Sequence, residues 1–556
     1  MITRSKAGLH MSRAYAATKH PLPVDLDFVP STYWQASKHS HWRAAMQDEY
    51  NALINTGTWS LVPSHPSQNV VGCKWVFRIK KNPDGTIDRY KARLVAKGFH
   101  QQEGVDFQET FSPVAKPVTI RILLTLAVQD NWFLNQLDIS NAFLHGDLKE
   151  DVYMQQPPGF IAPTSPHFVC KLKKSLYGLK QAPRAWFEKL FQALRTLGFH
   201  QSQSDASLFV LHGPQLVIVL VYVDDILVTG PNSQLCQQFI QQLSTQFPVK
   251  DLGPLHYFLG LEVHRSTKGI FLHQTKYLLD LLKKSTMEGA KPCCTPIGSQ
   301  KLDHSGPLLS NPTEYRAIVG GLQYLTWTRP DLAFAVNQIC QFMHAPREQH
   351  LQAAKRVLRF LKGSISHGLW FTKGPINLSA FSDADWAGCT FDRRSTSGYC
   401  VFLGSNLISW SAKKQSTVAR SSTEAEYRSL AHTAAELTWV CKILKDLKFS
   451  LPKLPHLWCD NISAISLASN PIFHARTKHV EIDYHYIREL VLAKLIKVSY
   501  VSSEDQVADL HTKSLSKSIF SYLCSKLPIG ILYDSSFSLR GCIRENDKSS
   551  NIVTVK

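Results

Sequence analysis

The chain lacks the cysteine patterns that mark disulfide scaffolds and small zinc modules. Its twelve cysteines are scattered, and Cys293 and Cys294 are the only close pair. No C-x-x-C motif and no Cys/His run with zinc-ligand spacing occurs. This pattern excludes a disulfide framework and predicts reduced thiols, as in cytosolic or nuclear proteins.

Long hydrophobic runs are also missing. The longest, LVIVLVYV at 216–223, is followed directly by two aspartates. It is much shorter than the roughly 20 apolar residues that a membrane-spanning helix needs, so we interpret it as a buried strand. The first residues, MITRSKAGLHMSR, are basic but lack the apolar core of a signal peptide. We therefore expect no membrane association.

Positive charge is what the chain has in excess. Lysine and arginine total 62 against 43 acidic residues, which gives a formal net charge of +19 spread along 556 residues. Such a surface favours a polyanionic partner, above all nucleic acid; the other interpretation is a basic protein without one. The length and the 44% of hydrophobic residues predict roughly two to four domains with cores of their own.

Alternating and helical patterns locate the expected elements. The segments KWVFRIKK (74–81) and RYKARLVAK (89–97) alternate basic and apolar residues around the turn sequence NPDG (82–85), which predicts a basic β-hairpin. Apolar spacing predicts helices over 34–53, 120–129 and 183–197, and the region 313–363, rich in aromatic residues and arginine, is also expected to be helical.

One acidic set suggests metal chemistry. Asp224 and Asp225 lie within the apolar strand sequence VIVLVYVDDILVTG, where unpaired charges are unfavourable unless a cation meets them. Neighbouring side chains on a strand face opposite ways, so we expect Asp224 to face the metal and Asp225 to support the turn. Asp138, at the end of the predicted strand 134–139, offers a third carboxylate. The alternative is an acidic turn without metal.

A second acidic set lies in the last third of the chain. Asp383 follows a strand-like stretch, Glu426 lies early in an amphipathic helix, and Asp460 ends the strand HLWCD. Asp509 lies in QVADLHTKSL, where an N-cap is the alternative role. Glu424 competes with Glu426 for the helical position. Tens of residues separate these acids, so only folding can unite them.

Several motifs, in order, resemble one family. LDISNAFLHGDL, SLYGLKQAPRAWF and VYVDDILV resemble the reverse transcriptases of copia-type long-terminal-repeat retrotransposons. GCKWVFRIKKNPDG resembles that family's fingers region, and DLGPLHYFLGLEV resembles its primer grip. Further on, SDADWAG, SSTEAEY, CDN and RTKHVEIDYHYIRE resemble the copia-type RNase H domain. The resemblance covers residues 34–517.

The resemblance implies an α+β and α/β multidomain fold. It predicts a right-hand polymerase with fingers, palm and thumb at 34–285, a connection region at 286–375, and an RNase H-like mixed sheet with flanking helices at 376–517. Residues 1–33 are interpreted as a polar linker remnant, and 518–556 as a tail without clear pattern.

The resemblance also assigns the polymerase residues. Asp138, Asp224 and Asp225 become the catalytic aspartates, with Asp138 and Asp224 as metal ligands. Phe143 becomes a steric gate against the 2′-hydroxyl of ribonucleotides; taken by itself, without the resemblance, core packing is the favoured explanation of a phenylalanine there. The residues expected to contact the incoming nucleotide are Lys91, Arg93, Phe143, Gly178, Lys180 and Gln181.

For the second acidic set, the resemblance implies RNase H catalysis. Asp383, Glu426, Asp460 and Asp509 become the ligands of two Mg²⁺ ions, and the polymerase site likewise takes two, with Mn²⁺ as a substitute. His479 and His485, in the last of these motifs, are interpreted as structural rather than catalytic.

Together these features predict an RNA-directed DNA polymerase that copies retrotransposon RNA into DNA and cleaves the RNA of the hybrid. The expected partners are an RNA template, a DNA primer, the RNA–DNA hybrid and deoxynucleoside triphosphates, with a homodimer or particle proteins as further candidates. The expected location is a cytoplasmic virus-like particle or the nucleus. No zinc-knuckle, aspartic protease or integrase pattern occurs, so we expect a polyprotein fragment. The alternative is a catalytically silent, basic nucleic-acid-binding remnant.

Overall fold

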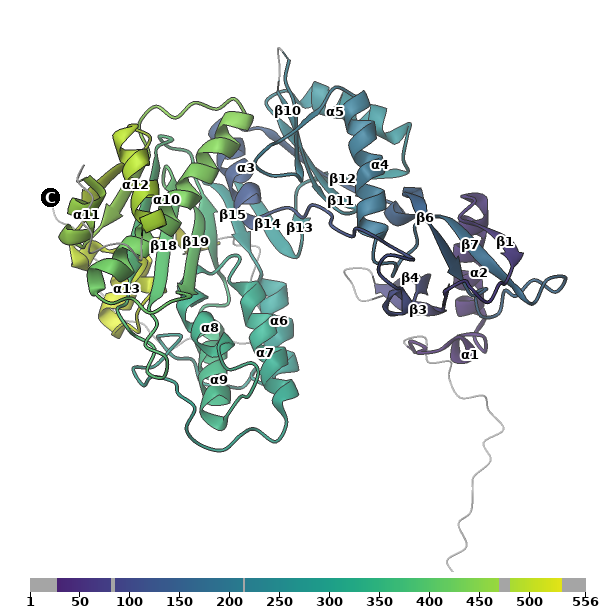
Figure 1. Cartoon of the computed structure of the whole chain (residues 1–556), viewed down its shortest axis with the longest axis horizontal. Helices are drawn as coiled ribbons and strands as arrows, with labels where there is room; N and C mark the ends of the chain where they lie inside the picture. The colour runs from purple at the N-terminus through teal and green to yellow at the C-terminus, as the bar shows by residue number, and fades with distance from the viewer. Residues whose placement is uncertain (1–27, 82–85, 214–215, 470–480, 533–556) are drawn as a thin grey trace, which may run out of the picture. The chain divides into compact units, whose positions relative to one another are not determined.

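The computed structural model describes residues 28–81, 86–213, 216–469 and 481–532 (Figure 1). It divides into two compact units, each described here by itself. The first contains the chain up to Ser112 and Asn141–Leu190, and the second contains Pro113–Ser140 and the chain from Phe191 onward. The region 34–285, expected as one polymerase domain, is therefore shared between the two units. The turn NPDG and His479 lie outside the described residues.

The first unit is built on a four-stranded sheet of order β1-β7-β6-β2 and a separate β3-β4 hairpin. Its strands are β1 Trp59–Pro63, β2 Val70–Val71, β3 Cys73–Lys81, β4 Ile87–Ala96, β6 Asp147–Met154 and β7 Phe168–Lys174. Its helices are α1 Tyr33–Ala36, α2 Ser40–Asn55, η2 Gly98–His100 and η3 Ala142–His145, while α4 Ala182–Thr196 begins in this unit and ends in the second.

The β3-β4 hairpin confirms the predicted pair of alternating strands. Cys73, Trp75 and Phe77 are buried, and the residues between them are exposed. Apolar residues of α2, among them Trp42 and Met46, belong to the same hydrophobic cluster. The single helix expected over 34–53 is interrupted between α1 and α2, where Ser37 ends the first helix and the backbone of His39 is extended.

The second unit begins with a six-stranded sheet of order β12-β5-β11-β10-β9-β8. Its strands are β5 Phe133–Ile139, β8 His200–Gln201, β9 Leu208–Leu211, β10 Val217–Tyr222, β11 Asp225–Gly230 and β12 Val249–Pro254. Helices α3 Pro117–Gln129 and α5 Ser233–Ser244 accompany it. The predicted run 216–223 is thus a central strand, buried at almost every position.

Next in this unit is an antiparallel sheet of order β13-β14-β15-β16-β22. Its strands are β13 Tyr257–Phe258, β14 Leu261–Ser266, β15 Gly269–His273, β16 His367–Phe371 and β22 Ile529–Ile531. The helices here are α6 Thr275–Lys284, α7 Pro312–Leu325, η4 Pro330–Leu332, α8 Ala333–Cys340 and α9 Glu348–Lys362.

The C-terminal sheet is mixed, with order β19-β18-β17-β20-β21. Its strands are β17 Leu378–Ala384, β18 Thr396–Leu403, β19 Asn406–Lys414, β20 His456–Cys459 and β21 Lys497–Tyr500. Its helices are α10 Ser422–Asp446, α11 Ile462–Ser469, α12 Glu481–Leu492, η6 Ser503–Asp505, η7 Val507–His511 and α13 Lys517–Ser525. Helix α10 packs on β17, where Ser382 bonds to Ser429.

The tail expected from 518 onward contains regular structure. Residues 517–525 form α13, which buries Phe520 and Leu523, and residues 529–531 form β22, which pairs with β16. A helix of nine residues with two buried positions gives little periodic signal. The strand forms only because a distant strand offers it a free edge.

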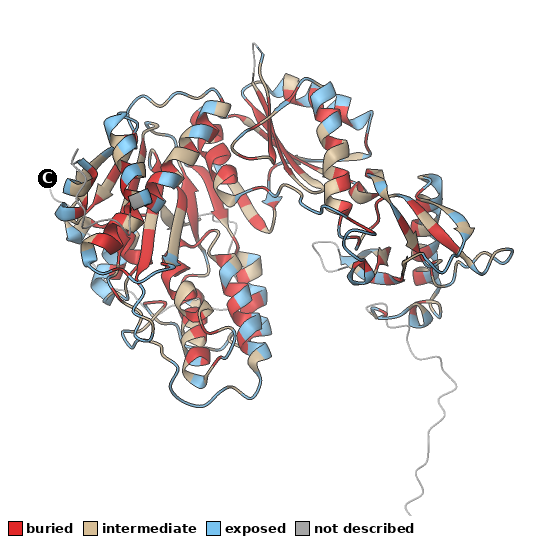
Figure 2. Cartoon of the chain, in the orientation of Figure 1, coloured by how far each residue is buried: buried red, intermediate tan, exposed pale blue. Residues whose placement is uncertain are grey.

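Helix α3 is buried on nearly all sides (Figure 2). It even buries Arg121, whose guanidinium donates to the backbone carbonyls of Ile408 (3.0 Å) and Trp327 (2.8 Å) and stacks over the Trp410 ring. These contacts satisfy a charged group that would otherwise be costly to bury. They also join the six-stranded sheet's helix to the C-terminal sheet. Within the described ranges, no helix is both long and apolar enough to cross a membrane.

Candidate active sites

Asp138, Asp224 and Asp225 form what we call the first carboxylate site, in the second unit. Strands β10 and β11 pair through Tyr222 and Asp225, which leaves Val223 and Asp224 as a two-residue turn. Val223 has a φ of +56°, which is rare for a β-branched side chain and is found where function or packing requires a strained turn. The Asp224 carbonyl accepts a hydrogen bond from the Ile139 backbone N–H (2.9 Å).

The register places Asp225 directly opposite Asp138 on the neighbouring strand β5. Directly paired residues of antiparallel strands project to the same face of the sheet. Alternation predicted that Asp224 faces the metal and that Asp225 supports the turn; the register adds that the side chains of Asp225 and Asp138 share one face of the sheet. Strand alternation does not extend to Asp224, because Asp224 belongs to the turn rather than to either strand.

The proximity of the three carboxyl groups affects the protonation of Asp225. Burial and, to a smaller extent, the negative charges of Asp224 and Asp138 together raise the pKa of Asp225 to about 6. The Gln136 amide lies 3.5 Å from the Asp225 carboxylate and offsets part of this effect. All three acids are half-buried and remain accessible to water.

In the first unit, the Tyr177 ring contacts two of the predicted residues, Arg93 and Phe143. Lys91 and Arg93 lie on one face of β4, and the Arg93 guanidinium stacks over the Tyr177 ring at 4.5 Å. The Phe143 ring meets Tyr177 edge-on at 5.0 Å. Among the described residues, no group pairs with the buried Nε of Arg93. Tyr177 was missed in the sequence, although it lies in the motif SLYGLKQAP.

The turn after Tyr177 contains Gly178, Lys180 and Gln181, which were all expected to contact the incoming nucleotide. Gly178 has a φ of +91°, and a Cβ there would lie 2.2 Å from the Ala96 carbonyl oxygen, so only glycine fits. Gln181 is 1% exposed; it donates to the Asp106 carbonyl and accepts from Gln101. It therefore braces the turn instead of facing a ligand. Lys180 is exposed, with its ammonium over the Phe107 ring.

The second carboxylate site consists of Asp383, Glu426, Asp460 and Asp509. Strand β17 runs parallel to β20, with Phe381 paired to Trp458. Asp383 and Asp460 therefore lie at the same end of adjacent strands, one within β17 and one directly after β20. The ends of neighbouring parallel strands are a common place for functional side chains.

Helix α10 supplies the third acid of this site. Glu426 is 6% exposed, and burial, followed by the charges of Asp383 and Asp460, raises its pKa far above the usual range. Its Oε2 has no hydrogen-bond partner within the described part of the chain. Glu424 instead forms an ion pair with Arg428 (2.9 Å) and accepts from the Arg420 N–H, so it caps the helix start.

Asp509 completes the site from the 3₁₀ helix η7. Burial raises its pKa to about 7, and the charge of Asp383 contributes to this rise. The N-cap alternative does not hold, because Ser516 caps the next helix α13. The Lys513 ammonium lies 2.7 Å from the Asp509 carboxylate and 3.4 Å from that of Asp383. Thr512 donates to the other Asp383 oxygen.

Four further residues surround the acids and were not identified from the sequence: Cys459, Ser503, Thr512 and Lys513. Ser503 donates to Asp460 (2.8 Å), and one atom each of Cys459, Glu426 and Asp460 lie within 4.8 Å of one another. The available signals in the sequence were that Cys459 directly precedes Asp460 and that Lys513 follows Asp509 by four residues. His485 is exposed on α12.

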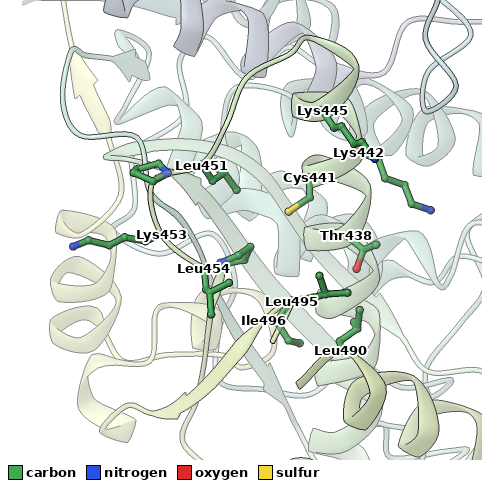
Figure 3. A pocket seen from close by; sticks show the side chains of 12 residues that line it. Thr438, Cys441, Lys442, Lys445, Leu451, Lys453, Leu454, Leu490, Leu495 and Ile496 are labelled. Atoms are coloured by element: carbon green, nitrogen blue, oxygen red, sulfur yellow. The ribbon is translucent and has the colours of Figure 1, made fainter. Parts of the chain in front are cut away.

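A hollow of about 510 Å³ lies elsewhere, between the end of α10, the loop 451–455, the end of α12 and the residues just before β21 (Figure 3). Leucines such as Leu490 and Leu495 line it, and Figure 3 shows the Lys442 and Lys453 ammonium groups pointing outward. None of the seven predicted acids lines this hollow. The hollow is therefore distinct from both carboxylate sites.

The first carboxylate site lies in a part of the chain that matches a known family. Residues 56–299 match the family model described as reverse transcriptase (RNA-dependent DNA polymerase). A putative transposon Ty5-1 protein of Saccharomyces cerevisiae is 34% identical over 310 residues, which is 54% of this chain and 100% of that protein. Residues 56–299 thus form a domain of the reverse transcriptase family.

Longer relatives give the particular family. The Pol polyprotein of transposon RE1 of Arabidopsis thaliana is 52% identical over 95% of this chain, and that of TNT 1-94 of Nicotiana tabacum is 38% identical over 95%. The chain belongs to the retrovirus-related Pol polyproteins of copia-type transposons. It spans 36% of the RE1 protein and 41% of the TNT 1-94 protein.

A solved structure of the foamy viral protease–reverse transcriptase with RNA/DNA hybrid is also similar to this chain. It covers 86% of this chain and 55% of the viral one, at 12% identity and a TM-score of 0.48.

Proposed function

We propose that this chain is an RNA-directed DNA polymerase and ribonuclease H, with two separate active sites that each use divalent metal ions. One observation carries the proposal: two sets of carboxylates, distant in sequence, each converge on one place in the fold. In this proposal the first unit acts as fingers, the six-stranded sheet as palm, the following elements as thumb and connection, and the C-terminal sheet as the RNase H-like domain.

The first carboxylate site suits nucleotidyl transfer. Three half-buried carboxyl groups lie together on paired strands and the turn between them, and a divalent cation would offset their mutual repulsion. Asp138 and Asp224 are therefore proposed as Mg²⁺ ligands, with Asp225 beside them. Divalent metal would lower the pKa of the primer 3′-hydroxyl and offset charge on the leaving pyrophosphate. The short turn and the β5-β11 pairing hold the three acids in place.

The group around Tyr177 suits nucleotide selection. Lys91 and Arg93 present two cations on one strand face, which would offset the triphosphate charge. The Phe143 ring, held against Tyr177, would exclude a 2′-hydroxyl. Gly178 and Lys180 are proposed to line the same pocket, whereas Gln181 contributes by bracing the turn.

The second carboxylate site fits a metal-dependent nuclease. Four acids converge, and one carboxylate oxygen of Glu426 is buried without a partner in the described chain, as expected of a ligand position. Mg²⁺, or Mn²⁺ as its substitute, would activate water and stabilise the departing 3′-oxygen. The chain's own groups orient the ligands: Thr512 holds Asp383, Ser503 holds Asp460, and the Ala384 N–H bonds to Glu426.

The partners follow from these two activities. We propose an RNA template, a DNA primer, the RNA–DNA hybrid and deoxynucleoside triphosphates as ligands, which suits the net charge of +19. A homodimer, particle proteins, and a cytoplasmic or nuclear location remain part of the proposal. A silent nucleic-acid-binding remnant is disfavoured, because both sets of acids are complete and converge.

A primer-extension assay with a labelled RNA template tests both activities at once. Purified protein with Mg²⁺ should lengthen the DNA primer and shorten the RNA strand, and chelation of Mg²⁺ should stop both. Binding of the hybrid should weaken steeply with salt, because phosphate contacts release counterions. A protein that binds the hybrid but changes neither strand would be the silent remnant.

A further inference from the structure

A sulfur atom lies among the oxygens of the second carboxylate site. Cys459 is the last residue of β20 and is fully buried. Its Sγ, one oxygen of Glu426 and one of Asp460 lie within 4.8 Å of one another. The proposed hydrolysis needs only oxygen ligands, so the thiol has no role in it.

The strand pairing explains why the sulfur reaches this position. Leu457 pairs with Ala380, whose side chain shares a face of β17 with Ser382, and Ser382 bonds to Ser429 of α10. Two residues beyond Leu457, Cys459 projects to the same α10 face. Glu426 approaches from α10, and Asp460 follows Cys459 directly. The three side chains are thus brought together by the sheet and its helix.

Two observations concern the hydrogen bonds made by the atoms of this group. Glu426 Oε2 is buried and, over the described residues, has no hydrogen-bond partner. The sulfur accepts a weak bond from the Asn461 N–H at 3.4 Å. A buried oxygen without a partner beside a polarisable sulfur is the environment of a metal ligand rather than of a packed core.

We propose that Cys459, Glu426 and Asp460 form a binding site for a soft divalent cation such as Zn²⁺, and that its binding inhibits the nuclease. Zn²⁺ accepts thiolate, carboxylate and water in a tetrahedral set, whereas Mg²⁺ takes oxygen ligands. As the Zn–S bond forms, the thiol proton passes to solvent. Glu426 and Asp460 are then withheld from Mg²⁺. The proposed Zn²⁺ binding does not depend on the nuclease activity, whereas the proposed inhibition rests on the proposed function.

The geometry requires little movement. Tetrahedral zinc separates its ligand atoms by about 3.5 Å, given its bond lengths, so a modest contraction of the group suffices. Asp460 is half-buried while Cys459 and Glu426 are buried, so the ion would enter from the Asp460 side. A water molecule on that side would complete the coordination.

Metal titrations of the full chain test the binding. Cd²⁺ would be added to the wild type and to Cys459→Ser and Cys459→Ala, with the thiolate–metal charge-transfer absorbance as readout, and Zn²⁺ would be titrated by calorimetry. Both variants should lose the part of the Cd²⁺ charge-transfer absorbance that comes from Cys459. Their Zn²⁺ affinity should be at least about tenfold weaker than that of the wild type. Cys236→Ser, at a fully buried cysteine of α5, is the matched control and should match the wild type.

Asp460→Asn gives a second test at a half-buried position, in case the cysteine variants do not fold. It should weaken Zn²⁺ binding as well. Equal Zn²⁺ affinity in the wild type, Cys459→Ser and Asp460→Asn would overturn the proposal.

The inhibition is measured separately, as RNA cleavage in a hybrid at fixed Mg²⁺ and rising Zn²⁺. The wild type should be inhibited at about tenfold lower Zn²⁺ than Cys459→Ser. Identical inhibition of the two proteins would overturn the inhibitory role. If the wild type binds Zn²⁺ through Cys459 but never cleaves the hybrid, the metal site stands and the proposed nuclease function fails.

Discussion

The two carboxylate sites differ in how far they withdraw their acids from water. At the first site Asp138, Asp224 and Asp225 are all half-buried, on paired strands and the turn between them. At the second site Asp383 is 1% exposed, and Glu426 and Asp509 are 6% and 8% exposed. One site is shallow and the other deep.

The degree of burial determines what offsets the charge of the carboxyl groups at each site when no metal is bound. Burial raises the pKa of Asp225 only to about 6, so water and neighbouring amides suffice at the shallow site. At the deep site the pKa shift of Glu426 is much larger, and the Lys513 ammonium lies between Asp383 and Asp509. Burial alone would lower the pKa of Lys513, but the two carboxylates raise it overall. The lesson is that a deep acidic site carries its own cation.

The strongest test of this comparison is the loss of a ligand at the shallow site. Asp224→Asn should reduce primer extension by about a thousandfold, or roughly 4 kcal/mol of transition-state stabilisation. Cleavage of the hybrid should remain, because the two sites use different acids. Steady-state extension and RNA cleavage on one substrate measure both. Extension at a tenth of the wild-type rate or better would remove Asp224 from the metal site.

The reciprocal change lies at the deep site. Asp383→Asn should reduce hybrid cleavage by about a thousandfold and spare extension, for the same reason. It should also reduce the rise in unfolding temperature that Mg²⁺ produces in the wild type. Glu424→Gln is the matched control, since Glu424 is bonded to Arg428, and it should retain cleavage. Loss of extension in Asp383→Asn would mean that the sites are not separate.

A smaller effect is expected at Phe143. Phe143→Val should raise the ratio of ribonucleotide to deoxynucleotide incorporation by about tenfold or more, because space for a 2′-hydroxyl is gained. Competition between the two nucleotides in single-turnover extension gives this ratio. Phe160→Val controls for loss of packing in the same hydrophobic cluster. An unchanged ratio in Phe143→Val would return Phe143 to a core residue.

The pH dependence of stability should separate the deep site from the shallow one. Asp509 has a raised pKa of about 7, so the folded chain holds a proton that the unfolded chain has lost above about pH 4. Its contribution to stability is therefore present at low pH and is lost as pH rises toward 7. In thermal unfolding without metal across pH 4–8, the unfolding temperature of Asp509→Asn should fall less steeply with rising pH than that of the wild type.

The corresponding window at the shallow site ends near pH 6, the pKa of Asp225. Asp225→Asn should therefore flatten the decline only below about pH 6. If both variants flatten the same pH range, depth does not distinguish the two sites.

The smallest expected effect concerns the resident lysine. Lys513→Met should lower the unfolding temperature of the metal-free chain by about 2–4 °C, because Asp383 and Asp509 lose their cation. With saturating Mg²⁺ the difference should shrink, since the acids then have another partner. Lys517→Met, at the exposed start of α13, serves as control. An effect that is the same with and without Mg²⁺ would show that Lys513 is merely structural.

Parts of both sites could be foreseen from local pattern, and others could not. The alternating β3 and β4 strands and the buried β10 follow from residue periodicity, which is local. The pairing of Asp225 with Asp138 could not be foreseen, because it depends on where the turn falls. From the sequence, Gln181 was expected to contact the nucleotide. Its burial against Asp106 and Gln101 is visible only in the fold, because those residues are distant in the chain.

By itself the sequence determined the family, the motifs and the identity of the acids, because residue type and order survive without coordinates. Tertiary structure decided which acids are deep and which glutamate faces the others: Glu426 rather than Glu424. It also brought Cys459 and Lys513 to the deep site. The physical reason is that burial, charge and hydrogen bonding are properties of neighbours in space. Parallel pairing of β17 with β20 and the position of α10 create those neighbours from residues far apart in the chain.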